Sequence, residues 1–199
     1  MQIKYFAYGS NLDLAQMKIR CPSSELISKG SLSGYRLTFN RYSSGWGGGV
    51  ADVIQDQDSK VWGLVFKLSN SDLKRLDSYE GCYNDQTSLY ERWKAVINTP
   101  KGQISDVWVY TVVEKQKFVQ PTLEYLQIIK DAAVRWNFPK ITEDEAWQYA
   151  IGSSTLEFSC VHQGLAWLLV QSSLHIGVSK PYKNPNVVTL TLKITLQLT

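Results

Sequence analysis

Histidine is nearly absent from this chain of 199 residues. The two histidines, His162 and His175, both follow Glu157, which is the last acidic residue. Their position excludes Ser-His-Asp and Cys-His nucleophile systems, and most zinc sites, from the long N-terminal part of the chain. Carboxylates, tyrosines, lysines and backbone amides are therefore the groups available there for catalysis.

Cysteine is also scarce. Cys21, Cys82 and Cys160 are an odd number without a CxxC pair, which argues against a disulfide framework or a zinc knuckle. Reduced thiols fit this pattern best. The N-terminus lacks the cationic, apolar and small-residue succession of a signal peptide. We therefore expect a cytoplasmic protein.

Strong net charge and long apolar runs are missing as well. The formal net charge is +3, an excess too small to indicate nucleic-acid binding. Residues 158–179 contain no Asp, Glu, Lys or Arg. Interleaved Ser, Gln, Gly and His nevertheless make this segment a poor membrane span, which needs about 20 mostly apolar residues. We expect no nucleic acid and no membrane as a partner.

What the first 113 residues do contain is a series of short strands. Residues 50–54 and 61–68 read as a hairpin around a polar turn at 55–60, and the glycine-rich stretch 43–49 is expected to be a turn or bulge. So many short strands predict an α+β fold, a small mixed or antiparallel β-barrel with flanking helices after the first and fourth strands. The expected strands are 2–8, 32–39, 50–54, 61–68, 89–97 and 103–113.

A Gly-Ser-Asn turn follows the first strand. Gly9 allows unusual backbone torsions, and Ser10 or Asn11 can cap a helix over 13–19. The free N–H groups and the positive dipole end of such a helix start favour a carboxylate or a phosphate. The same residues also fit an ordinary strand-to-helix connection.

Two further helices are expected. One ends around Glu80, where a carboxylate meets the negative end of the helix dipole, so the side chain either points into water or pairs with a nearby Arg or Lys. The other begins at Pro121, which suits the first helical position. Tyr125 either joins the apolar face of this helix or presents its hydroxyl to a cavity. That face consists of Leu123, Leu126, Ile129, Ala132, Ala133 and Trp136.

Three motifs, in this order and spacing, resemble the γ-glutamylcyclotransferase family, which also contains the AIG2-like proteins. They are YFAYGSNL at 5–12, WGLVF at 62–66 and LDSYEG at 76–81. The resemblance predicts one family-like domain over 1–150 and leaves 151–199 as a C-terminal extension of unknown role. We assign the extension to packing or self-association, which allows a homodimer.

The resemblance implies a mixed barrel with a cavity at one end, where family members release 5-oxoproline from γ-glutamyl compounds without a metal or an organic cofactor. Glu80 is the implied catalytic acid/base residue. The implied substrate-binding residues are Tyr5, Phe6, Ala7, Tyr8, Gly9, Ser10, Asn11, Tyr90 and Tyr125.

The expected function is therefore cyclisation of a small-molecule γ-glutamyl substrate, an amino acid or dipeptide derivative, whose α-amine attacks its own γ-carbonyl. Glu80 would take the amine proton and return one to the leaving group. Two alternatives stay open. One is a γ-glutamylamine cyclotransferase, whose substrates carry the γ-glutamyl group on a lysine side chain or another amine. The other is a non-catalytic binding module on the same fold.

Overall fold

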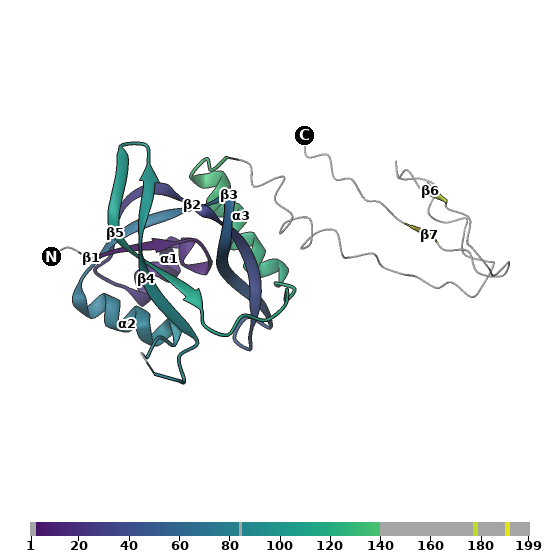
Figure 1. Cartoon of the computed structure of the whole chain (residues 1–199), viewed down its shortest axis with the longest axis horizontal. Coiled ribbons are helices and arrows are strands. Elements are labelled where there is room, and N and C mark those ends of the chain that lie inside the picture. The colour runs from purple at the N-terminus through teal and green to yellow at the C-terminus, as the bar shows by residue number, and fades with distance from the viewer. Residues whose placement is uncertain (1–2, 84, 140–176, 179–189, 192–199) are drawn as a thin grey trace. The chain divides into compact units, whose positions relative to one another are not determined.

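The computed structural model describes residues 3–83, 85–139, 177–178 and 190–191. Within the first two ranges, five strands close into a barrel in the order β1-β3-β2-β4-β5, and helices flank it (Figure 1). The expected α+β barrel is confirmed. The strands are β1 (Ile3–Ala7), β2 (Glu25–Ser43), β3 (Gly48–Leu68), β4 (Tyr90–Thr99) and β5 (Gly102–Val112). The helices are the 3-10 helix η1 (Ser10–Leu12) and the α-helices α1 (Leu14–Arg20), α2 (Asn70–Glu80) and α3 (Leu123–Arg135).

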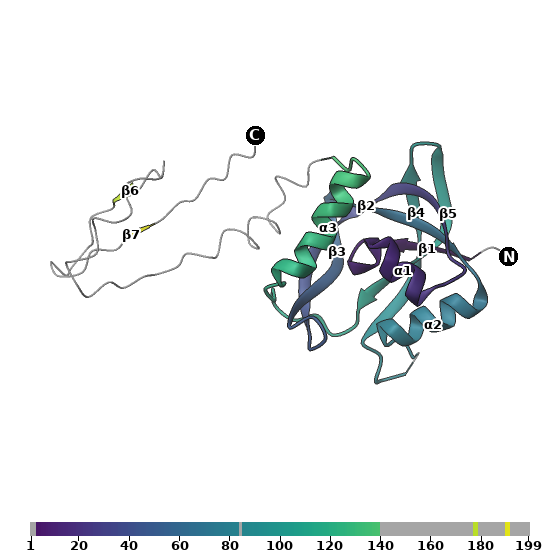
Figure 2. The same cartoon turned by 180° about the vertical axis from the view of Figure 1, so that it is seen from behind.

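Strand β1 closes the barrel between its two neighbours. It pairs antiparallel with β3 and parallel with β5, so that Tyr5 lies opposite Phe66 on one side and Trp108 on the other. Both edges of β1 are thereby paired, as closure requires. The turn after β1 is consequently attached to a strand that the barrel holds from both sides (Figure 2).

The expected hairpin around 55–60 is wrong. Both of its strands belong to β3, a continuous strand of 21 residues that pairs antiparallel with β2, which has 19 residues. The polar stretch is an irregularity in this pairing. Ser33 pairs with Lys60, and the next pair is Tyr35 with Gln55. The chain therefore advances two residues on β2 and five on β3 at this point. The glycine-rich stretch 43–49 contains the turn between β2 and β3, as expected.

Two helix starts also differ from expectation. Asp13, rather than Ser10 or Asn11, caps α1, and its carboxylate accepts hydrogen bonds from the amides of Ala15 and Gln16. Helix α3 begins at Leu123, one residue after the capping residue Thr122, and not at Pro121. Each cap is a short side chain with an oxygen that reaches the second or third free amide of its helix. Leu123 itself is 82% exposed and does not belong to the buried face.

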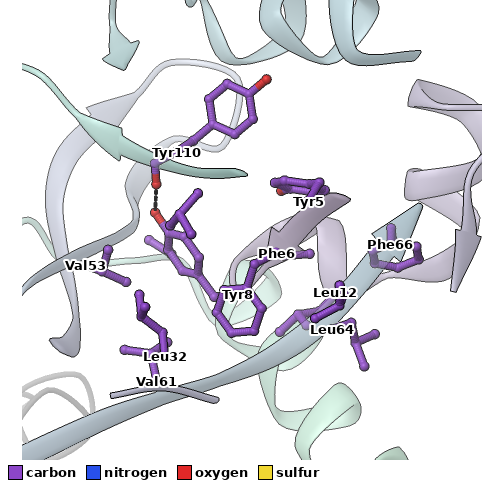
Figure 3. Packing of buried hydrophobic residues seen from close by; sticks show 14 of the residues in the cluster. Tyr5, Phe6, Tyr8, Leu12, Leu32, Val53, Val61, Leu64, Phe66 and Tyr110 are labelled. Atoms are coloured by element: carbon purple, nitrogen blue, oxygen red, sulfur yellow. Dashed lines mark hydrogen bonds between the residues drawn. The ribbon is translucent and has the colours of Figure 1, made fainter. Parts of the chain in front are cut away.

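The barrel interior is apolar and close-packed around β1. Phe6 and Ala7 are completely buried, and Leu64 and Val65 of β3 are buried with them. Figure 3 shows Tyr8 within this cluster, with its hydroxyl directed at the carbonyl oxygen of Tyr110. Burying a large apolar side chain stabilises a fold by about 1.5–3 kcal/mol, so this packing fixes the position from which the next turn begins.

Of the expected C-terminal extension, four residues are described. Gly177–Val178 (β6) and Leu190–Thr191 (β7) pair antiparallel. Cys160 lies outside the described residues, whereas Cys21 and Cys82 are free and buried. None of the helices in the described part of the chain has the length and hydrophobicity of a membrane span.

Candidate active site

The turn after β1 leaves little room for a side chain at Gly9. Gly9 has φ −114° and ψ −137°, a combination outside the strand and helix regions, which agrees with the expected unusual torsions. A Cβ built on Gly9 would lie 2.9 Å from the Tyr125 Oη and 3.1 Å from the Ala51 Cβ. The missing side chain lets α3 bring the Tyr125 hydroxyl against the turn.

Glu80 reaches the same region from α2. Ser69 caps this helix at its start, and Gly81, with φ +68°, ends it in the left-handed conformation that glycine tolerates. Leu76, one turn before the end, is completely buried and anchors the helix. The Glu80 side chain is only 16% exposed. The helix therefore ends with a carboxylate that faces the protein and not the solvent.

Asn11 connects the turn to Glu80. Its Nδ2 donates to Glu80 Oε1 at 2.9 Å and to the Tyr5 hydroxyl at 2.8 Å. Its Oδ1 accepts from Arg20 Nη1 at 2.8 Å and from Gln16 Nε2 at 3.3 Å. Two acceptors lie beside Nδ2 and two donors lie beside Oδ1. Only one orientation of the Asn11 amide therefore makes all four hydrogen bonds. The assignment of Asn11 to substrate binding stays a prediction, and in the structure its amide hydrogen-bonds to Glu80.

Arg20 is the nearby cation. Its Nη1 lies 3.7 Å from Glu80 Oε1, and its guanidinium group sits over the Tyr79 ring at 5.3 Å from the centroid. Sequence reasoning left open whether Glu80 points into water or pairs with an Arg or Lys. The second of these two alternatives is correct.

Burial raises the pKa of Glu80 above its usual value, and it outweighs the opposing effects of the Arg20 charge and the Asn11 hydrogen bond. A carboxyl group whose pKa is shifted toward neutrality exchanges protons more readily near pH 7. The environment of Glu80 therefore suits a group that both accepts and donates a proton.

Tyrosines surround this carboxylate. Burial raises the pKa of each of them, and the negative charge of Glu80 raises it further, so all lie within its electrostatic reach. For Tyr125 the pKa rises to about 12, although the Ala51 and Ser10 amides and the Ser10 hydroxyl oppose the increase. The five tyrosines are Tyr5, Tyr8, Tyr90, Tyr110 and Tyr125.

The remaining predicted residues are placed as follows. Ser10 is buried and contacts Tyr125 at the turn, which agrees with a role for both in one site. Phe6 and Ala7 lie in the completely buried core. Their assignment as substrate contacts stays a prediction.

Glu80 lines neither of two cavities found in the described part of the chain. One of about 230 Å³ includes Tyr8 and Leu12 in its lining. One of about 370 Å³ lies among Arg36, Asn40 and Lys115. Among the described residues, no group of three or more His, Cys, Asp or Glu side chains is placed to hold a metal ion.

Comparison with known proteins identifies the family of this chain. The sequence profile of the family described as gamma-glutamyl cyclotransferase, AIG2-like, matches residues 5–131, which include the turn, Glu80, Tyr90 and Tyr125. The chain belongs to this family.

Relatives and solved structures agree with the assignment. The gamma-glutamylcyclotransferases of Bos taurus and Homo sapiens are each 30% identical over 129 residues, a match that covers 63% of this chain and 66% of theirs. The chain thus spans somewhat less than two thirds of the length of these relatives. A solved structure titled gamma-glutamyl cyclotransferase superimposes with a TM-score of 0.64 at 26% identity, covering 77% of this chain and 88% of that one.

Several residues near Glu80 were not predicted from the sequence. Arg20 and Tyr110 were missed, as was Asp77, which accepts a hydrogen bond from the Tyr110 hydroxyl at 2.6 Å and pairs with Arg92 at 2.9 Å. The unfavourable position of Glu80 at a helix C-terminus was a signal that a cation should compensate it. Nothing in the sequence indicated which one.

Proposed function

We propose that this protein is a γ-glutamylcyclotransferase that releases 5-oxoproline from γ-glutamyl compounds, with Glu80 as general base and then general acid. Membership of the family and the 30% identical relatives support the reaction class. The observation that carries the role of Glu80 is its setting. A nearly buried carboxylate with a raised pKa is held by Asn11 at the Gly-Ser-Asn turn.

The reaction is intramolecular, so the protein mainly has to hold a folded substrate. The α-amine nitrogen attacks the γ-carbonyl carbon, and the ionised Glu80 takes a proton from that nitrogen. A carbon–nitrogen bond forms, which closes the five-membered lactam. The original amide bond then breaks, and Glu80 returns the proton to the departing amine. Proton and electron pairs balance without an external reactant.

The turn is suited to the negative charge of the substrate or of the reacting oxygen. The Tyr125 hydroxyl accepts a hydrogen bond from the Ala51 amide at 3.1 Å and lies against Ser10, so its own proton is available for donation. A fixed hydroxyl and nearby amides stabilise an oxyanion more than water does, because they need no reorientation. This arrangement supports the assignment of Ser10 and Tyr125 to the substrate.

The test is 5-oxoproline release from a panel of γ-glutamyl dipeptides, glutathione and γ-glutamyl-lysine. We expect Glu80→Gln to lower kcat by about 10²–10⁴-fold, the usual contribution of general acid–base catalysis, with substrate binding retained. Glu91→Gln is the matched control, because Glu91 is exposed on β4. The control should keep wild-type turnover.

Two results would overturn the proposal. Unchanged turnover in Glu80→Gln would remove Glu80 from the mechanism. Binding of a γ-glutamyl compound by the wild type, without release of 5-oxoproline from any of the panel, would instead favour a non-catalytic binding module. A cytoplasmic location and a homodimer stay predictions.

A further inference from the structure

The tip of the β2–β3 hairpin lies against two of the four tyrosines that were predicted to bind the substrate, Tyr90 and Tyr125. Trp46, in the glycine-rich turn, contacts Tyr125 edge-on, with ring centroids 5.0 Å apart. Arg41, near the end of β2, places its guanidinium group 6.0 Å from the centroid of the Tyr90 ring. The glycine-rich stretch is therefore more than a connection between two strands.

The tip is firmly held in this position. The Gly49 amide donates to the Gln120 carbonyl oxygen at 2.8 Å, and a Cβ on Gly49 would lie 2.0 Å from the Val119 carbonyl oxygen. Only glycine permits so close an approach of two backbones. The tip is thus fixed to the segment that leads into α3, beside which it lies in Figure 1.

A β-bulge separates the directions of the neighbouring side chains. Phe39 is paired with Ala51, but Arg41 is paired with Val50, so β2 advances two residues while β3 advances one. Bulges redirect side chains in this way near functional sites. Here Phe39 packs against Tyr125, with ring centroids 6.2 Å apart, and Arg41 points to the Tyr90 ring.

The charge of Arg41 is not neutralised by any carboxylate that the structure describes. Other arginines of the barrel are paired, Arg36 with Asp56 at 3.6 Å and Arg92 with Asp77 at 2.9 Å. In the described part of the chain, Arg41 has no salt bridge, and its cation–π contact is with a buried tyrosine within reach of Glu80. A partly buried guanidinium group matches the geometry of a carboxylate.

We infer that the β2–β3 tip is the subsite for the leaving amine, with Arg41 binding its free carboxylate and Trp46 packing beside its side chain. The substrates would accordingly be γ-glutamyl α-amino acids and not γ-glutamylamines without a carboxylate. This inference rests on the proposed function and names its substrate class.

The test compares γ-glutamyl-alanine with γ-glutamyl-ethylamide, which differs only by lacking the carboxylate. We expect the wild type to prefer the alanine compound in kcat/KM by about ten- to a hundredfold, the size of one hydrogen bond to a charged group. Arg41→Met should abolish this preference by lowering kcat/KM for the alanine compound alone. Arg41→Lys should restore part of it, because the charge returns without the planar fork.

Arg36→Met is the matched control, since Arg36 lies on the same strand but is paired with Asp56. It should keep the wild-type preference. Equal kcat/KM of the wild type for both compounds, or a preference that survives in Arg41→Met, would overturn the inference while leaving the cyclotransferase activity established. Absence of 5-oxoproline from both compounds would count against the proposed function itself.

Discussion

Arg20 and Arg41 each lie over a tyrosine ring, Tyr79 and Tyr90 respectively, but the protein holds the two arginines in opposite ways. Arg20 is 18% exposed, donates to Asn11 at 2.8 Å and lies 3.7 Å from Glu80. Arg41 has its described contact with the face of Tyr90. A cation that is fully engaged by the protein tunes the groups around it, whereas one that is left without a counter-charge is available to a ligand.

The same contrast extends to the segments that carry the two arginines. The Glu80 region is a closed hydrogen-bond network in which the Asn11 amide is used by four partners. The β2–β3 tip is held instead by backbone contacts at Gly49. The first arrangement suits catalysis and the second suits recognition.

Removing the centre of the network should have the largest effect. We expect Asn11→Leu to lower the free energy of unfolding by about 3 kcal/mol, because buried partners on both sides of the amide lose a hydrogen bond. It should also lower kcat by at least tenfold, since Glu80 loses its support. Urea denaturation and 5-oxoproline release measure the two effects. Asn98→Ala, at a half-buried position outside the site, is the control, and equal losses in both variants would contradict the network role.

Crowding the turn should have the next largest effect. Gly9→Ala places a Cβ 2.9 Å from the Tyr125 Oη and should destabilise the fold by about 1–3 kcal/mol, the usual cost of overpacking. Adding Tyr125→Phe removes that oxygen and should recover part of the loss in thermal unfolding. Gly45→Ala, whose nearest neighbour is 3.8 Å away, should be close to neutral. No recovery in the double variant would show that the hydroxyl is not the source of the clash.

The smallest expected effect is a shift in pH dependence. Arg20 lowers the pKa of Glu80, so Arg20→Gln should raise that pKa. Because the base must be ionised, the acid limb of kcat/KM against pH should move to higher pH, while Arg41→Gln should leave it in place. The other titratable groups facing Glu80 are Tyr5, Tyr8, Cys21, Tyr90, Tyr110 and Tyr125.

The outcome of that pH profile separates two roles for Arg20. A shift to higher pH supports electrostatic tuning of Glu80. An unchanged limb together with a lower Tm would reduce Arg20 to a structural partner of Asn11.

Local features of the chain were predicted well from the sequence. The helix that ends at Glu80 and Gly81 was expected where α2 lies, since its cap at Ser69 and its glycine end are set by neighbouring residues. The barrel and the family followed from strand spacing and from three motifs. The split of β3 into two strands was a mistake, because a polar stretch looks like a turn when the length of its partner strand is unknown.

The sequence by itself thus determined most of the elements, the family and the carboxylate at the end of α2, because propensity, capping and motif spacing act over a few residues. Only the tertiary structure decided which side chains meet that carboxylate. Arg20 and Asn11 come to Glu80 from about 60–70 positions away, and the bulge in β2 aims Arg41 at Tyr90. Such contacts depend on strand register and helix packing, which are settled when the whole barrel closes.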